Sequence, residues 1–291
     1  APDNTPGNKT LFSKSVARTL LAKIYAEKPL RDYTKVIQYC DEVKEDGFDL
    51  VDDFSDLFGM NAAGTDAKMR NTKESILEAQ FTSGAGNWCT WMFGRDLVNW
   101  NNNFTWAKWV TPSRDLISAF KQEGDEVRFK ESIVYYDCNW SNYYPSDNYP
   151  FMYKCRSANS SIIKYRYADV LLLKAEALIM QDTPDLEGAA DIIDEVRDRA
   201  KLGALPTSVR SNKNAMLNAL LKERRLELAF EGQRWFDLVR LDKVEEVMNA
   251  VYAKDSGRKA QIYTFDKNSY RLPIPQSVID ANDKIHQNPG Y

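Results

Sequence analysis

The sequence predicts an all-α, mostly helical protein with tetratricopeptide-like helical hairpins, long aromatic-rich loops and little β structure. Three observations support this fold class. Apolar residues recur at helical spacing in two separate hairpins that resemble each other. A further block, residues 214–241, carries a broad apolar helical face. The segments between these blocks are rich in glycine, asparagine and aromatic residues, a composition typical of loops.

The first hairpin is predicted over about residues 14–46. Its first helix, residues 14–27, repeats apolar residues every three or four positions, and Ser13 is its predicted N-cap. Its second helix, residues 32–45, carries a second apolar stripe and ends before Gly47.

The second hairpin is predicted over about residues 166–202 and has the same design. Its helices match those of the first hairpin at offsets of 151 and 153 residues, so the loops differ by two residues. Repetition of helical hairpins indicates tetratricopeptide-like units, although the long segment between the two copies is not expected of a simple solenoid. The matching positions of the first helices are Ala17, Leu20, Leu21, Lys23 and Ala26 with Ala168, Leu171, Leu172, Lys174 and Ala177.

The segment between the hairpins alternates short ordered elements with loops. Residues 74–81, "ESILEAQF", predict a strand or a short helix. Thr111 is predicted to cap a helix that has Pro112 in its first position. Residues 139–153 contain prolines among tyrosines and asparagines, and we predict a loop there.

The last part of the chain, residues 214–291, is predicted to hold two helices and a tail. Gly232 interrupts the apolar pattern of residues 214–241, which indicates two helices or a kink. A short helix is expected at about residues 276–281. We expect all of residues 1–291 to belong to one domain.

Composition excludes several classes of function. The net charge is -3 and the sequence pI is about 5.5, so the basic surface typical of nucleic-acid binding is missing. No run of 18 apolar residues spans a membrane. A single histidine excludes a multi-histidine metal site, and we expect neither a metal nor a cofactor. The four cysteines allow a Cys138–Cys155 pair or four free buried thiols.

Two acidic patterns invite a catalytic or a metal-binding interpretation. Glu227 and Glu231 lie one helical turn apart and could be the carboxylates of a glycoside hydrolase. Such neighbours point the same way rather than flanking a sugar, so we favour a structural ion-pair network with nearby arginines. The candidate partners are Arg224, Arg225 and Arg234. The acidic residues of "DLVDDFSDLF" lack the glycine and final glutamate of an EF-hand loop and indicate a solvated turn.

Several segments resemble the SusD/RagB family of Bacteroidetes surface lipoproteins, in the family's order. "ERRLELAFEGQRWFDLVRL" (223–241) is similar to a signature of the family, and so are "YRYADVLLLKAEAL" (165–178) and "YRLPIPQSVIDANDKIHQNPGY" (270–291). "SKSVARTLLAKIY" (13–25) and "PSRDLISAF" with "DEVRFKESI" (112–133) fit the same order. Family members are usually longer, so the chain is expected to be a C-terminal portion lacking about 200 residues.

The resemblance implies a non-catalytic protein on the outer face of the bacterial outer membrane. Such a protein binds oligosaccharide or polysaccharide and delivers it to a TonB-dependent transporter of the SusC kind. Its attachment would be a lipid anchor that this chain does not contain. A peptide-capturing member of the same family is the alternative, and a glycoside hydrolase is the alternative from another class.

Two aromatic loops in a ligand-loop region, about residues 82–155, are the candidate binding surface. Aromatic faces can cover the apolar face of a sugar ring, while amide, carboxylate and guanidinium groups bind its hydroxyls. Trp106 and Trp109 are instead expected to anchor the first loop to the scaffold. The candidate ligand-binding residues are Trp88, Trp91, Phe93, Arg95, Trp100, Asn101 and Asn102 in the first loop, and Trp140, Tyr143 and Tyr144 in the second.

Overall fold

The computed structural model describes residues 1–82, 111–137, 143–254 and 264–291. These residues form two compact units, Ala1–Gln233 and Arg234–Tyr291, and each unit is described by itself. The predicted fold class, mostly helical with little strand, is confirmed within the described residues. None of the described helices is long and apolar enough to cross a membrane.

The first unit opens with a pair of antiparallel helices, α1 (Lys14–Ala26) and α2 (Tyr33–Glu45), joined through the short 3-10 helix η1 (Lys28–Leu30). The Ser13 hydroxyl accepts a hydrogen bond from the Val16 N–H and so caps α1, as expected. After α2 the chain turns at Gly47, whose φ of 87° favours glycine.

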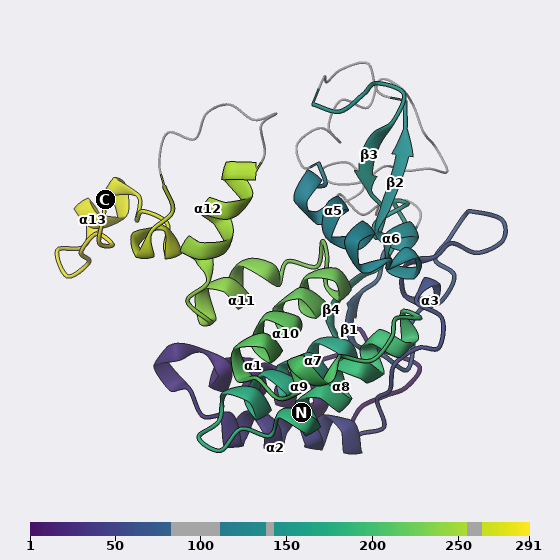
Figure 1. Cartoon of the computed structure of the whole chain (residues 1–291), viewed down its shortest axis with the longest axis horizontal. Helices are drawn as coiled ribbons and strands as arrows, with labels where there is room; N and C mark the ends of the chain where they lie inside the picture. Colours follow the sequence, from purple (N-terminus) through teal and green to yellow (C-terminus); the bar gives the residue numbers. More distant parts are fainter. Residues whose placement is uncertain (83–110, 138–142, 255–263) are drawn as a thin grey trace. The chain divides into compact units, whose positions relative to one another are not determined.

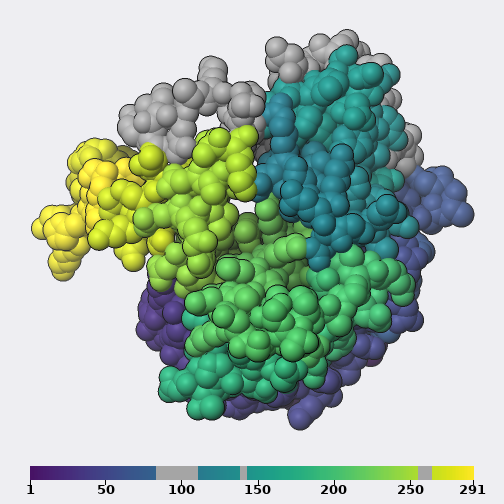
Figure 2. Space-filling view, viewed as in Figure 1, coloured from purple at the N-terminus to yellow at the C-terminus, as the bar shows by residue number. Residues whose placement is uncertain are grey.

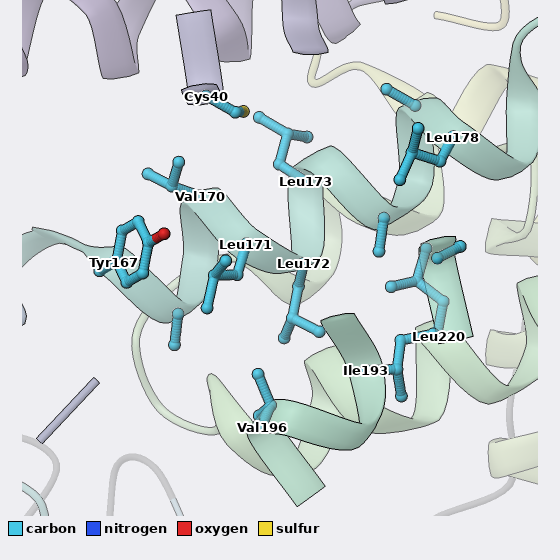
Figure 3. Close-up of a cluster of buried hydrophobic side chains, with 14 of the residues drawn as sticks. Cys40, Tyr167, Val170, Leu171, Leu172, Leu173, Leu178, Ile193, Val196 and Leu220 are labelled. Atoms are coloured by element: carbon cyan, nitrogen blue, oxygen red, sulfur yellow. The ribbon is translucent and has the colours of Figure 1, made fainter. Parts of the chain in front are cut away.

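A second pair, α7 (Tyr167–Met180) and α8 (Leu186–Arg199), stacks on the first (Figure 1). Nearly every residue of α7 is buried, because α2, α8 and α10 (Lys213–Glu227) all pack against it. Lys23 of α1 donates to Asp169 of α7 at 2.6 Å. Figure 3 shows side chains of α2, α7 and α8 meeting in one apolar core, to which α10 adds Leu220.

Two small antiparallel sheets lie between the helical pairs in the sequence. Strand β1 (Ser75–Ala79) pairs with β4 (Ile162–Arg166). Residues 74–81, which were predicted as a strand or a short helix, thus contain a strand. Strand β2 (Ile133–Tyr136) pairs with β3 (Tyr149–Met152). The loop predicted for residues 139–153 is therefore wrong over β3. Pro150 is accommodated because a two-stranded sheet leaves every strand with a free edge.

Two helices precede β2, namely α5 (Arg114–Glu123) and α6 (Glu126–Ser132). The N-cap of α5 is Ser113, whose hydroxyl accepts from the Leu116 N–H, so the prediction of Thr111 as the cap is wrong. Pro112 lies ahead of the helix, because the cap is Ser113 and α5 begins at the next residue, Arg114. The side chains of α5, α6, β2 and β3 gather in one lobe in the space-filling view (Figure 2). Among its described residues, this unit also has the short helices α3 (Ser55–Phe58) and α9 (Thr207–Arg210).

The apolar block at residues 214–241 divides as Gly232 predicts, with α10 ending at Glu227 and α11 (Arg234–Arg240) following. Gly232 has a φ of 76°. The second unit comprises α11, α12 (Val244–Lys254), the 3-10 helix η3 (Lys267–Tyr270) and α13 (Gln276–Ala281). Trp235 on α11 lies in the apolar pattern of residues 214–241, which predicts a core position, and this prediction is wrong. Its side chain is 36% exposed, and its ring packs edge-on against Phe265 at 6.4 Å.

Candidate functional site

Aromatic side chains form a continuous cluster beside the β2–β3 sheet. The rings of Tyr143 and Tyr144 meet edge to face at 4.8 Å between centroids. Tyr144 contacts Tyr149 at 5.6 Å, and Tyr149 contacts Phe151 at 5.4 Å. Tyr149 and Phe151 are each 2% exposed, whereas Tyr143 and Tyr144 are only partly buried. The cluster, defined here as these four residues, thus has a buried base on β3 and a partly exposed end.

Arg114, in the first turn of α5, fixes the exposed end of the aromatic cluster. Its guanidinium carbon lies 3.9 Å from the centroid of the Tyr143 ring and 4.9 Å from that of Tyr144. An Nη of Arg114 also donates to the backbone carbonyl of Tyr143. The Tyr144 hydroxyl donates to the Pro112 carbonyl at 2.8 Å. These contacts combine cation–π attraction with hydrogen bonds, and the sequence contained no signal that assigned Arg114 to this position.

Tyr143 and Tyr144 are the predicted ligand residues that the described structure contains, and it brings them together. Their rings pack on each other and on Arg114, so both help to anchor the loop as well as forming part of its surface. The other predicted ligand residues lie outside the described residues, as do the predicted anchors Trp106 and Trp109 and the cysteine Cys138. They are Trp88, Trp91, Phe93, Arg95, Trp100, Asn101, Asn102 and Trp140.

Glu227 lies at the centre of a buried charge network below these elements. Its carboxylate accepts from Arg128 at 3.0 Å, from Arg166 at 2.5 Å and from Arg199. Glu74, just before β1, bonds the same Arg166 at 2.7 Å and Arg199 at 2.5 Å. Burial alone would raise the pKa of Glu227, but the surrounding cations hold that pKa well below its usual range. Glu227 therefore remains ionised at neutral pH.

Glu231 extends the charge network toward Lys154, which follows β3. Lys154 donates to Glu231 at 2.6 Å and to the Glu227 carbonyl at 2.8 Å. Arg166 binds both Glu231 oxygens, at 2.6 Å and 2.8 Å. Burial lowers the pKa of Lys154 to about 8, although Glu231 opposes that shift. The Lys154 ammonium also lies 4.7 Å from the centroid of the Phe58 ring.

The ion-pair interpretation of Glu227 and Glu231 is confirmed, and the ion pairs that the structure describes for Arg224 and Arg225 are made with other carboxylates. Arg224 pairs with Asp169 at 2.8 Å and Arg225 pairs with Asp115 at 2.6 Å. The two glutamates bind cations that are distant in the sequence, because the fold brings Arg128, Lys154, Arg166 and Arg199 around them. Side chains of Glu227 and Glu231 are 0% and 10% exposed, so this carboxylate pair is enclosed by its cations rather than open to a sugar.

The acidic turn after the first hairpin is neutralised by lysines. Lys73 binds Asp49 at 3.3 Å and Asp52 at 3.0 Å. Lys68 binds Asp53 and Asp56 at 3.2 Å and 2.7 Å. Among the residues that the structure describes, no group of three or more His, Cys, Asp or Glu side chains could hold a metal ion. In the described structure, the cations beside these carboxylates are lysine ammonium groups.

Comparison with known proteins links the chain to one family. The family model described as "SusD family" matches residues 144–291, slightly more than half of the chain. SusD-like protein P38 of Formosa agariphila is 42% identical over 99 residues, which are 32% of this chain and 19% of that protein. The matched region thus spans about a fifth of that curated relative.

Solved structures share the fold over nearly the whole chain. A SusD-like protein from Bacteroides fragilis has a TM-score of 0.73 and 21% identity, covering 99% of this chain and 67% of that one. Surface glycan-binding protein A from Bacteroides thetaiotaomicron, in complex with laminarihexaose, has a TM-score of 0.73 and 19% identity. That match covers 98% of this chain and 66% of the other. Taken with the family match over residues 144–291, the helical pairs and the C-terminal signatures establish that the chain belongs to the SusD family.

Proposed function

We propose that this chain is part of a non-catalytic cell-surface protein that captures oligosaccharide or polysaccharide. Membership of the SusD family is the observation that carries the proposal. The structure of a neighbour, surface glycan-binding protein A, is a complex with laminarihexaose, which supports a glucan-type oligosaccharide as the first ligand to test. Delivery of the captured glycan to a SusC-like TonB-dependent transporter is the further step of the proposal. The location is the outer face of the outer membrane, with a lipid anchor in the complete protein.

The proposed ligand surface is the ligand-loop region of residues 82–155 together with the exposed end of the aromatic cluster. Its residues are those named from the sequence, with Trp91 and Trp100 as stacking platforms and Asn101 and Asn102 as hydrogen-bonding partners of sugar hydroxyls. The packing of Arg114 on Tyr143 supports this assignment, because a binding loop needs a rigid attachment to its scaffold.

Binding without catalysis is supported by the state of the one carboxylate pair that suggested a hydrolase. A glycoside hydrolase needs one carboxyl group that keeps its proton and two groups that flank the sugar. Glu227 is held ionised by its cations, and Glu231 is bonded to Lys154 and Arg166. This pair therefore favours a structural role.

Affinity electrophoresis against a panel of polysaccharides that includes laminarin tests the proposal. We expect retarded migration in at least one gel, together with no release of reducing sugar when protein and glycan are incubated. The Trp91→Ala and Trp100→Ala variants should each lose most of the retardation. Trp235→Ala, a tryptophan outside the ligand-loop region, is the matched control and should migrate as the unmodified chain does.

Three results would contradict the proposal in different ways. Release of reducing sugar would replace capture with hydrolysis. Binding of oligopeptides, measured by calorimetry, without retardation by any glycan would favour the peptide-capturing alternative. Retardation that survives both tryptophan substitutions would move the binding surface away from the first aromatic loop.

A further inference from the structure

Two buried polar atoms on α6 have no hydrogen-bond partner in the part of the chain that the structure describes. They are Nη2 of Arg128 and the hydroxyl oxygen of Ser132, and both residues are 0% exposed. Buried polar groups are nearly always hydrogen-bonded, and an unpaired one opposes folding because it has lost its hydration. The two atoms therefore indicate a bonding partner other than the described protein groups.

Arg128 cannot satisfy its third nitrogen by turning, because the other two nitrogens of its guanidinium are held in place. Nε donates to Asp125 at 2.5 Å, and Nη1 donates to Glu223 at 2.5 Å and to Glu227 at 3.0 Å. Rotation of the guanidinium would break these charge-assisted bonds. Arg166, in the same charge network, differs because each of its three nitrogens donates to a carboxylate or a carbonyl.

Nε of Arg199 also lacks a hydrogen-bond partner among the described residues, but its surroundings differ. The guanidinium carbon of Arg199 lies 5.1 Å from the centroid of the Phe54 ring, so an aromatic face covers this group. Arg128, in contrast, has a second unpaired polar atom on its own helix, the hydroxyl of Ser132.

Arg128 and Ser132 lie one turn apart on the same face of α6. Side chains four positions apart on a helix have Cβ atoms roughly 5–6 Å from each other. A water molecule with a hydrogen bond of roughly 2.8 Å on each side spans a similar distance. The helix therefore brings both unpaired atoms within reach of one small bridging molecule.

The charges around Arg128 select the class of that molecule. Its guanidinium is paired with three carboxylates, so an added anion would meet an excess of negative charge. An added cation would face an N–H donor, because arginine offers no acceptor. The complete burial of both residues leaves no access for a sugar ring. A neutral molecule that carries both an acceptor and a donor fits these conditions, and water is the smallest of this class.

We propose that one buried water molecule bridges Arg128 and Ser132 and completes the charge network. The water oxygen accepts from Nη2 of Arg128, and the water shares a second hydrogen bond with the Ser132 hydroxyl, which can donate or accept. Because Arg128 also bonds Glu223 and Glu227 of α10, this water is part of the attachment of α6 to that helix. The site is independent of glycan binding, since neither Arg128 nor Ser132 is among the residues proposed to contact glycan.

A crystal structure of the chain that resolves ordered water tests the site directly. We expect one peak of water density at roughly 2.7–3.2 Å from both Arg128 Nη2 and Ser132 Oγ. Crystals soaked in sodium bromide should show no anomalous scattering there, since a bromide peak would identify an anion site instead. A Ser132 hydroxyl bonded to the Arg128 carbonyl, with no density beside Nη2, would overturn the proposal. Density that contacts only one of the two atoms would refute the bridge.

Nuclear Overhauser measurements between water and the side-chain N–H groups of arginine test the same site in solution. The guanidinium of Arg128 should show a cross peak with the sign of a long-lived bound water. The guanidinium of Arg166, whose nitrogens are all bonded to protein groups, is the internal control and should show none. Absence of the Arg128 cross peak from the unmodified chain would refute the proposal.

Variants of Ser132 test whether its hydroxyl holds the water. Ser132→Ala should abolish the Arg128 cross peak, whereas Ser132→Thr, which keeps a hydroxyl, should retain it. Ser15→Ala removes an equally buried hydroxyl that is bonded to Asp46, and this matched control should leave the cross peak unchanged. A cross peak that survives Ser132→Ala would show that the hydroxyl is not a partner of the water. If Ser132→Ala does not fold, the density and the cross peak of the unmodified chain decide the question.

Discussion

Glu227→Gln tests whether the buried charge network stabilises the first unit. The substitution keeps the size and shape of the side chain and removes its negative charge. Three cations lose their shared partner, at 3.0 Å for Arg128, at 2.5 Å for Arg166 and at the short contact of Arg199. None of the three groups can move into water, because the side chains of all three arginines are at most 4% exposed.

The expected loss of stability follows from the number of hydrogen bonds that the substitution removes and from the partners that the arginines keep. A hydrogen bond to a charged group contributes roughly 1.5–3 kcal/mol, so three bonds suggest an upper limit of about 9 kcal/mol. The true loss is smaller, because Arg128 keeps Glu223, Arg166 keeps Glu74 and the new amide oxygen still accepts one bond. Breaking one buried ion pair typically costs about 3–5 kcal/mol, and we expect about 4 kcal/mol here.

Urea unfolding followed by circular dichroism measures this loss, since the helices lie mainly in the first unit. The midpoint should fall while the slope with urea stays the same, and the melting temperature should fall by roughly 10 °C. Glu246→Gln, which breaks an exposed pair with Lys243, is the matched control and should cost at most about 1 kcal/mol. A loss below about 1 kcal/mol for Glu227→Gln, with an unchanged slope, would refute the reasoning.

Four further predictions concern single buried or stacked groups. Burial would raise the pKa of Asp169, but the cationic partners of Asp169 have the larger effect and lower that pKa. The ionised carboxylate therefore makes its full contribution to folding stability above about pH 4, and this contribution is lost in more acidic solution. Unfolding free energy should therefore fall less for Asp169→Asn than for the unmodified chain between pH 6 and pH 3 in urea titrations. For Lys154, whose pKa falls to about 8 in the folded state, the unfolded chain binds more protons between about pH 8 and pH 10.4. Stability relative to Lys154→Met should rise across that range by up to about 3 kcal/mol, measured by urea unfolding at each pH. Arg114→Lys loses the planar stack on Tyr143 and should cost about 1 kcal/mol in thermal unfolding, whereas an unchanged midpoint would count against the stack. Glu231→Gln should lower stability without changing polysaccharide retardation, and lost binding in a folded variant would contradict its structural role.

Helices whose signals lie within the helix itself could be predicted from the sequence. In α2, Val36, Cys40 and Val43 recur at helical spacing and are buried, and Gly47 provides the turn that follows. The same holds for α10 and α11, where Gly232 marks the break. Such signals need no knowledge of the rest of the chain, because spacing and turn chemistry act over a few residues.

Elements that depend on a partner could not be predicted in the same way. Strand β3 contains Pro150 among tyrosines, which favours a loop until β2 supplies the pairing strand. Trp235 lies in an apolar pattern that predicts a core position, yet it packs on Phe265, which comes from beyond the following helix. Similarly, the position of Arg114 over Tyr143 joins residues that are 29 positions apart.

In the candidate site, too, local features could be predicted and long-range partners could not. Aromatic loops could be recognised by composition, and Tyr143 and Tyr144 do lie together. The sequence predicted that Glu227 forms ion pairs, but it did not identify the partners, since these cations lie between 28 and 99 residues away. A carboxylate on a helix requires compensation when it is buried, but sequence spacing identifies partners only within a turn or two.

Charge, rather than apolar contact alone, fixes the lobe that carries the aromatic cluster to the helical pairs. Apolar packing also joins the two parts, since Ile117 of α5 and Leu226 of α10 belong to one apolar cluster. Such contacts are non-directional and tolerate small shifts. Arg128 and Lys154 belong to the lobe and bond Glu227 and its neighbours at hydrogen-bond distances, which do not tolerate shifts when the groups are buried. Substitutions in the network should therefore weaken the attachment of the lobe to the helical pairs and lower stability, while the side chains proposed to contact glycan stay unchanged.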